Sequence, residues 1–147
     1  MISFILEIAS SDEGSTRAKG TRILIVDDEP AVLFAYRRLL EREGLEVDAC
    51  ERLADALQLL QARRYLAVIA DMRLAGSDNA DGLEILKRVR CEWPATRVIL
   101  ATGYGSSAVA TTARELGASH YFVKPVPPSV ILEALREASD TVQTNLA

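Results

Sequence analysis

Five side chains that could hold a cation or a phosphoryl group each come directly after a short apolar run. Asp27 and Asp28 follow the run RILIV, Asp71 follows LAVIA, and Thr102 and Lys124 end two later runs. Carboxylates gathered in one place repel one another unless a cation lies among them. Ligation by oxygen alone, with room left for water, suits Mg²⁺ better than a soft metal. The residue types therefore predict a Mg²⁺ site, with a hydroxyl and an ammonium group that would bind phosphoryl oxygens.

The apolar runs alternate with segments of helical periodicity along most of the chain. Runs of about 4–8 apolar residues are typical of buried strands, and apolar residues three and four positions apart are typical of helices. Gly44 and Gly117 follow two of the helical segments as C-terminal stops. We expect strands at 22–26, 45–49, 66–70, 98–101 and 119–123, and helices at 30–43, 53–64, 81–92, 106–116 and 128–138.

Five strands alternating with five helices predict an α/β fold with a parallel, doubly wound, flavodoxin-like sheet. Right-handed crossovers leave few topologies, and the strand order 2-1-3-4-5 is a common choice for five strands. In this order the carboxyl ends of strands 1, 3, 4 and 5 lie along one edge of the sheet, where such folds bind ligands. We therefore expect residues from both ends of the chain to converge there.

Each of these residues also has an ordinary structural interpretation. Asp27 and Asp28 could cap the helix that begins at Pro30. Asp71 could be a turn aspartate, and Lys124 a solvated surface lysine. Several independent coincidences are needed to imitate the joint placement, so we favour the site.

Composition limits the class of protein. The chain has 147 residues, 26% of them charged, and a net charge of −4. Its length and composition indicate one globular domain. We place this domain at 21–140, between an N-terminal extension and linker at 1–20 and a short tail at 141–147. The acidic balance weighs against direct nucleic-acid binding, and no apolar run approaches the ~20 residues of a membrane span. Cys50 and Cys91 lack metal-ligand spacing, so free thiols and residence in the cytoplasm are expected.

Four features in order resemble response-regulator receiver domains. They are ILIVDDEP at 23–30, Asp71, ATGYG at 101–105 and YFVKP at 121–125, and the resemblance covers about 21–138. It implies a phosphoacceptor of a two-component or phosphorelay system rather than an enzyme. Such a domain accepts a phosphoryl group from a histidine kinase or phosphotransfer protein and signals to a downstream protein target.

The resemblance also implies a role for each site residue. Asp71 would be the phosphoacceptor, and Thr102 and Lys124 would bind the phosphoryl group. The Mg²⁺ ligands would be Asp27, Asp28, Asp71 and the backbone carbonyl of Arg73. Thr102 and Tyr121 would form the switch that responds to phosphorylation, and the Lys124–Pro125 peptide bond is typically cis in this family.

The segment after Asp71 departs from the family pattern. The usual proline is replaced by Ala75, and Gly82 lies eleven positions beyond Asp71, so the loop is about three residues longer than usual. Two large residues, Arg73 and Tyr104, are expected to shield an acyl phosphate from water.

Other functions remain open at this point. The same fold could serve as a docking module that is not phosphorylated, as a phosphatase-like hydrolase, or as a flavin-binding protein. The complete set of site residues argues against the first, and the sequence Asp-Asp-Glu-Pro after the first strand argues against the last. The chain could also be a fragment of a hybrid kinase or transcription regulator, and it could form a homodimer.

Overall fold

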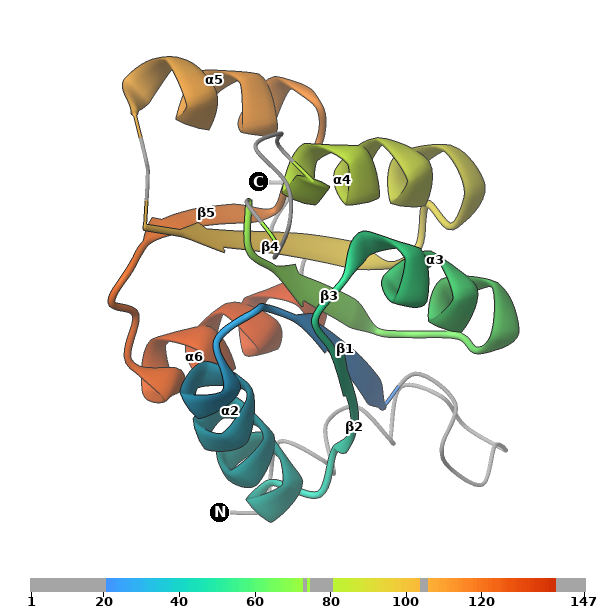
Figure 1. Ribbon diagram of the computed structural model, residues 1–147, viewed down its shortest axis with the longest axis vertical. Coiled ribbons are helices and arrows are strands. Elements are labelled where there is room, and N and C mark those ends of the chain that lie inside the picture. The colour runs from blue at the N-terminus through green and yellow to red at the C-terminus, as the bar shows by residue number, and fades with distance from the viewer. Residues whose placement is uncertain (1–20, 73, 75–80, 104–105, 140–147) are drawn as a thin grey trace.

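Five strands and five helices alternate along the chain in the computed structural model (Figure 1), which describes residues 21–72, 74, 81–103 and 106–139. The strands are β1 (Arg22–Val26), β2 (Glu46–Cys50), β3 (Ala67–Ala70), β4 (Arg97–Thr102) and β5 (His120–Val123). The helices are α2 (Pro30–Arg42), α3 (Leu53–Ala62), α4 (Asp81–Glu92), α5 (Ser107–Glu115) and α6 (Pro128–Ser139). The expectations for 1–20, Arg73, 75–80, Tyr104 and 141–147 concern residues outside those described.

The strands form one parallel sheet in the predicted order, β2-β1-β3-β4-β5. In the register, Val26 of β1 pairs with Ala70 of β3, and Ala70 pairs with Leu100 of β4. Thr102, the last residue of β4, pairs with Val123 of β5. The carboxyl ends of four strands therefore lie along one edge, which is the arrangement that the site requires.

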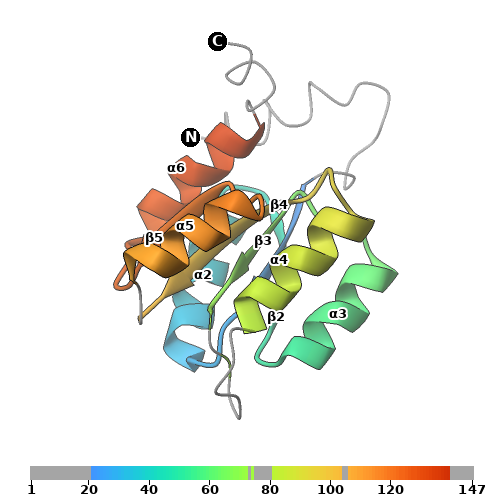
Figure 2. The ribbon, with the colours of Figure 1, turned by 90° about the horizontal axis from the view of Figure 1, so that it is seen from above.

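Helices cover both faces of the sheet, α2 and α6 on one face and α3, α4 and α5 on the other (Figures 1 and 2). Side chains alternate along β1 between the two cores: Ile23 and Ile25 pack toward α2 and α6, and Leu24 and Val26 pack toward the opposite layer. All four are at most 1% exposed. A strand buried on both faces must be apolar at every position, which explains why β1 and β3 are continuous apolar runs.

The helix ends follow local chemistry. Pro30 opens α2, where its missing N–H costs nothing, and Gly44 follows that helix with a φ of 88°. The Ser106 hydroxyl caps α5 by accepting a hydrogen bond from the Val109 amide at 3.2 Å. Among the helices in the described ranges, none is both long and apolar enough to cross a membrane.

The predicted boundaries hold within two residues, and the largest difference is at the end of α3. The sequence pattern extends this helix to Arg64, but the structure ends it at Ala62. Arg63 adopts an extended backbone and turns its guanidinium to Asp48 of β2, at 2.9 Å. The helix therefore ends with its last apolar residue, Ala62, and the first residue after it pairs with a neighbouring strand.

Candidate functional site

The predicted site residues lie at the carboxyl edge of the sheet, each immediately after or at the end of a strand. Asp27 and Asp28 follow β1, and Asp71 follows β3. Thr102 ends β4, and Lys124 follows β5. The register keeps these strand ends level, because the Asp71 amide donates to the Val26 carbonyl at 2.9 Å and the Lys124 amide donates to the Thr102 carbonyl at 2.8 Å. Four short strands thus bring together residues distant in sequence.

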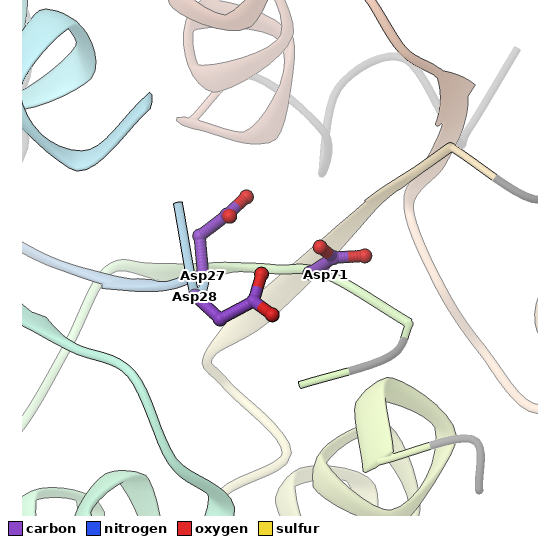
Figure 3. A group of neighbouring side chains, drawn as sticks. All are labelled: Asp27, Asp28 and Asp71. Carbon is purple, nitrogen blue, oxygen red and sulfur yellow. The ribbon is translucent and has the colours of Figure 1, made fainter. Parts of the chain in front are cut away.

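Three carboxylates from two neighbouring strands face one another at this edge (Figure 3). One oxygen from each of Asp27, Asp28 and Asp71 lies within 4.8 Å of the others. Asp27 is 4% exposed and Asp71 is 7% exposed, whereas Asp28 is half-buried. Such burial of like charges is unfavourable without a cation close by.

The Lys124 side chain is that cation in this structure. Its ammonium donates to Asp27 Oδ2 at 2.8 Å and to Asp71 Oδ2 at 3.0 Å, and it lies 3.5 Å from a carboxylate oxygen of Glu29. The other oxygen of Asp27 accepts a hydrogen bond from the Glu29 amide at 2.9 Å. Asp27 therefore forms a local turn before α2 rather than its cap, because the N-cap residue is Glu29 and no side chain among the described residues caps the helix, and Asp27 also joins the site.

The electrostatics of the cluster follow from burial and from this contact. Burial raises the pKa of Asp27 and the charge of Asp71 adds to the effect, although Lys124 and the Glu29 amide oppose it. Burial works against the charge of Lys124, but its hydrogen bonds to Asp27 and Asp71 outweigh that effect and raise its pKa well above the usual range. The ammonium therefore stays charged at neutral pH, while the carboxylates remain in excess.

The two expected switch residues occupy neighbouring strands. Thr102 is fully buried at the end of β4, and Tyr121 lies half-buried in β5, where it packs against the core formed with α3, α4 and α5. The Tyr121 hydroxyl is buried and has no hydrogen-bond partner within the described ranges. A buried hydroxyl without a partner is costly, and no hydrogen bond within the described residues fixes the Tyr121 hydroxyl in this position.

The sequence did not reveal that Gly82 packs against the backbone of Asp71 and Met72. Gly82 is the second residue of α4, and its amide donates to the Met72 carbonyl at 3.0 Å. A Cβ atom at this position would lie 2.6 Å from the Asp71 carbonyl oxygen and 2.9 Å from the Met72 Cα atom. The start of α4 thus packs directly on the backbone of Asp71, despite the lengthened loop between them.

Tyr36 also makes a contact that the sequence did not reveal. Its place in the helical apolar pattern indicated only a core position, and it is indeed 6% exposed. Its hydroxyl donates to the backbone carbonyl of Val126 at 2.9 Å, two residues beyond Lys124. The signal available in the sequence was the general need of a buried tyrosine hydroxyl for a partner.

The donor set fits a hard divalent cation. Oxygens that share one Mg²⁺ lie about 3–4 Å apart, given a metal–oxygen distance of about 2.1 Å, so the carboxylates need to close in only slightly. The three carboxylates carry more negative charge than the Lys124 ammonium neutralises, which favours a further cation. The Arg73 carbonyl, the fourth expected ligand, lies outside the described residues.

The comparisons with known proteins agree with this geometry. The model of one protein family, described as the response regulator receiver domain, matches residues 23–136. The alginate biosynthesis transcriptional regulatory protein AlgB of Pseudomonas syringae pv. tomato is 39% identical over 116 residues, which is 79% of this chain and 25% of that relative. The chain therefore spans about a quarter of the length of that curated relative.

Two solved structures have the same fold. A response regulator receiver domain protein from Methanospirillum hungatei is 30% identical, with a TM-score of 0.76 over 85% of this chain and 98% of that one. A response regulator protein from Burkholderia pseudomallei is 31% identical, with a TM-score of 0.72 over 86% of this chain and 73% of that one. The latter structure contains a phosphorylated aspartic acid, a calcium ion and citrate.

Proposed function

This chain belongs to the response regulator receiver domain family, and from that premise we propose that Asp71 is its phosphoacceptor. The phosphoryl group would come from the phosphohistidine of a histidine kinase or of a phosphotransfer protein, in a Mg²⁺-dependent reaction. One observation carries the proposal. The Lys124 ammonium, from the end of β5, bridges Asp71 after β3 and Asp27 after β1.

The chemistry assigns a task to each side chain. An oxygen of Asp71 attacks the phosphorus, the bond to the donor nitrogen breaks, and an acyl phosphate forms while the nitrogen recovers a proton. Lys124 holds Asp71 beforehand and can neutralise a phosphoryl oxygen afterwards, and the Thr102 hydroxyl can donate to another. Bound by Asp27, Asp28, Asp71 and the Arg73 carbonyl, Mg²⁺ would supply charge neutralisation, which phosphoryl transfer needs more than covalent help from the protein.

The output is proposed to be a protein contact. A small shift of Thr102 and Tyr121 toward the phosphoryl group would change which conformation is favoured at the surface built from α5, β5 and α6. This surface offers a hollow of about 330 Å³ between β5 and α6, lined in part by Phe122 and Val130. The candidates to bind in this hollow are a second copy of the chain and a downstream protein.

Because the chain spans only a quarter of the AlgB relative, its place in a longer transcription regulator or hybrid kinase is equally a proposal. A receiver fold that only docks, without phosphorylation, is the competing function. It is less favoured because three buried or half-buried carboxylates and their ammonium would then be retained without a task.

Small-molecule phosphorylation tests the proposal. Acetyl phosphate with Mg²⁺ should add one phosphoryl group to the wild-type protein, detected by intact mass, and Asp71→Asn should abolish the addition. Asp55→Asn, at an exposed position on α3, is the matched control and should label like wild type. Binding of beryllofluoride, a phosphoryl mimic, should likewise require Mg²⁺ and Asp71. Labelling of Asp71→Asn at the wild-type rate would remove Asp71 from its role.

A further inference from the structure

The hydroxyl of Tyr36 holds the segment that carries Lys124. Tyr36 is a residue of α2 and is buried in the core. Its hydroxyl donates to the Val126 carbonyl at 2.9 Å, a contact between residues 90 positions apart. A phenylalanine would fill the same apolar space, so the hydroxyl contributes this hydrogen bond rather than packing. The bond joins α2, which begins beside Asp27, to the segment that begins at Lys124.

The backbone of this segment can make few hydrogen bonds of its own. Residues 125–128 are Pro-Val-Pro-Pro, so Val126 carries the only backbone N–H among the four. On one side the Lys124 amide donates to Thr102, and on the other the Val130 amide donates to the Pro127 carbonyl at the start of α6. In the part of the chain that the structure describes, Tyr36 provides the only side-chain hydrogen bond to residues 125–128.

The position of this segment sets the point from which the Lys124 side chain reaches the two carboxylates. The ammonium contacts Asp27 at 2.8 Å and Asp71 at 3.0 Å, so both contacts are already at hydrogen-bond length. A displacement of the backbone moves the start of the flexible Lys124 stem, so the side chain must change its torsion angles to keep both contacts. Electrostatics places Tyr36 close to the same groups: burial raises its pKa, the Lys124 charge opposes this and the Asp27 charge adds to it.

We propose that Tyr36 is a positioning residue for phosphoryl transfer, because its hydrogen bond to Val126 fixes the backbone from which Lys124 reaches Asp71. The proposal rests on the proposed function of Asp71. It predicts that losing the hydroxyl slows phosphoryl uptake without removing any group that touches the phosphoryl donor. Misplacement of a reacting group by about 1 Å can cost about a hundredfold in rate, so a partial misplacement should cost several-fold.

The test compares two buried tyrosines. Tyr36→Phe removes the hydroxyl that bonds the segment after Lys124. Tyr65→Phe removes a hydroxyl that donates to Asp48 at 2.6 Å, and Tyr65 lies just before β3, at the amino ends of the strands and away from the site. Initial rates of labelling by acetyl phosphate at saturating Mg²⁺ are measured after circular dichroism shows that both variants are folded. Tyr36→Phe should label about three- to tenfold more slowly than wild type, and Tyr65→Phe should stay within about twofold.

A double-mutant cycle separates positioning from a general structural effect. In a Lys124→Met background there is no ammonium to position, so adding Tyr36→Phe should cause no further loss of labelling rate. Equal losses in the presence and absence of Lys124 would overturn the proposal. A wild-type rate for Tyr36→Phe would overturn it as well.

A measurement without donor or metal keeps the outcome separate from the proposed function. Amide chemical shifts and ¹⁵N relaxation of Lys124 and Val126 should change in Tyr36→Phe and not in Tyr65→Phe. If the wild-type protein does not label at all, the proposed function fails, and the amide signals still decide whether Tyr36 positions Lys124. Unchanged signals at both amides would refute that positioning.

Discussion

The Lys124 side chain neutralises part of the negative charge of the site before any metal binds. Its ammonium contacts two carboxylates that are nearly inaccessible to solvent, and its own side chain is 15% exposed. A buried carboxylate that loses a cationic neighbour pays more of the desolvation cost of its charge. A divalent cation at the same carboxylates would therefore compete with an ammonium already in place.

Lys124→Met should lower the free energy of unfolding by about 1–3 kcal/mol in the absence of Mg²⁺, because Asp27 and Asp71 lose a charged partner. Millimolar Mg²⁺ should then stabilise the variant more than it stabilises wild type, because no ammonium competes. Urea unfolding with and without Mg²⁺ measures both effects. Lys87→Met, at an exposed position on α4, is the control and should change neither. Equal stabilisation of wild type and Lys124→Met would show that the ammonium and the metal do not compete.

At this scale the sequence predicted most of the site, because residues after parallel strands must share one edge. It placed Asp27, Asp71 and Lys124 correctly relative to one another. It missed the Tyr36 hydrogen bond, since an aromatic residue in an apolar helical pattern carries no sign of which distant carbonyl its hydroxyl meets. That partner depends on how α2 packs beside the segment after β5, which only tertiary structure determines.

Among the elements, α4 approaches the backbone that follows β3 closely enough to leave no room for a Cβ atom at Gly82. The helix begins against the Asp71 backbone, and Gly82 is the residue that permits this distance. Movement of α4 would therefore be transmitted to Asp71 through main-chain contact rather than through a side chain. Close packing of this kind resists even one added methyl group.

Gly82→Ala should lower the free energy of unfolding by about 1–3 kcal/mol, because its Cβ would overlap backbone atoms that cannot rotate away. It should also slow labelling of Asp71 by displacing the Asp71 carbonyl. Gly103→Ala is the matched control beside Thr102, since none of the described residues has an atom within 4 Å of a Cβ there. Thermal or urea unfolding of the two variants is the measurement. A Gly82→Ala protein as stable as Gly103→Ala would mean that α4 can shift freely.

The β2 edge of the sheet carries a charge network at Asp48. Its carboxylate accepts a hydrogen bond from the Tyr65 hydroxyl at 2.6 Å and pairs with Arg63 at 2.9 Å and with Arg22 at 3.3 Å. Burial works against the charge of Asp48, but these partners outweigh it and hold its pKa below the usual value of 3.8. Charged side chains along an edge strand also discourage pairing with another sheet.

A carboxyl group whose pKa is lower in the folded state stabilises the protein above its unfolded pKa, and the effect is lost as the pH falls through the folded value. Asp48→Asn should therefore cost about 1–2 kcal/mol at pH 7, a modest amount because the network is partly exposed. The difference from wild type should shrink as the pH falls below 3.8. Urea unfolding across this range, with Asp55→Asn as control, measures it. A difference that stays constant with pH would exclude an ionic contribution.

The elements themselves were predicted almost completely, because continuous apolar runs and amphipathic segments alternate without ambiguity. The largest boundary difference lies where charged residues follow the last apolar residue of α3, and there Arg63 is outside the helix and pairs with Asp48. The β2 strand is the weakest signal, since Glu46 and Asp48 interrupt its apolar pattern. Its polar residues make sense only once β2 is known to be the edge strand with a charge network.

Over the whole molecule, the side of the sheet that ends in strand β2 and the side that ends in strand β5 expose different kinds of side chain. The β2 edge is charged, whereas the surface of α5, β5 and α6 exposes apolar side chains, with Val123 at 56% and Val130 at 37%. Apolar exposure near a hollow is typical of surfaces that bind other proteins. The proposed phosphorylation site lies at the edge of this surface through Thr102 and Tyr121.

Activation should therefore reach the α5, β5 and α6 surface more than the opposite edge. With Mg²⁺ and beryllofluoride, amide chemical shifts should change around Asp71 and Thr102 and along β5 and α6, and they should change little in β2 and α3. Two-dimensional NMR of the labelled chain measures this, with Asp71→Asn as the control that should not respond. Changes confined to α2 would place the output surface elsewhere.

The cation that neutralises the site comes from the end of the last strand, and this has a consequence for how the protein is made. Synthesis produces Asp27, Asp28 and Asp71 well before Lys124 leaves the ribosome. Until β5 joins the sheet, a growing chain holds three carboxylates and no internal ammonium among them, so docking of the strands at this edge is opposed by repulsion. The repulsion at this edge is therefore relieved only once β5 has joined the sheet and brought Lys124 to Asp27 and Asp71.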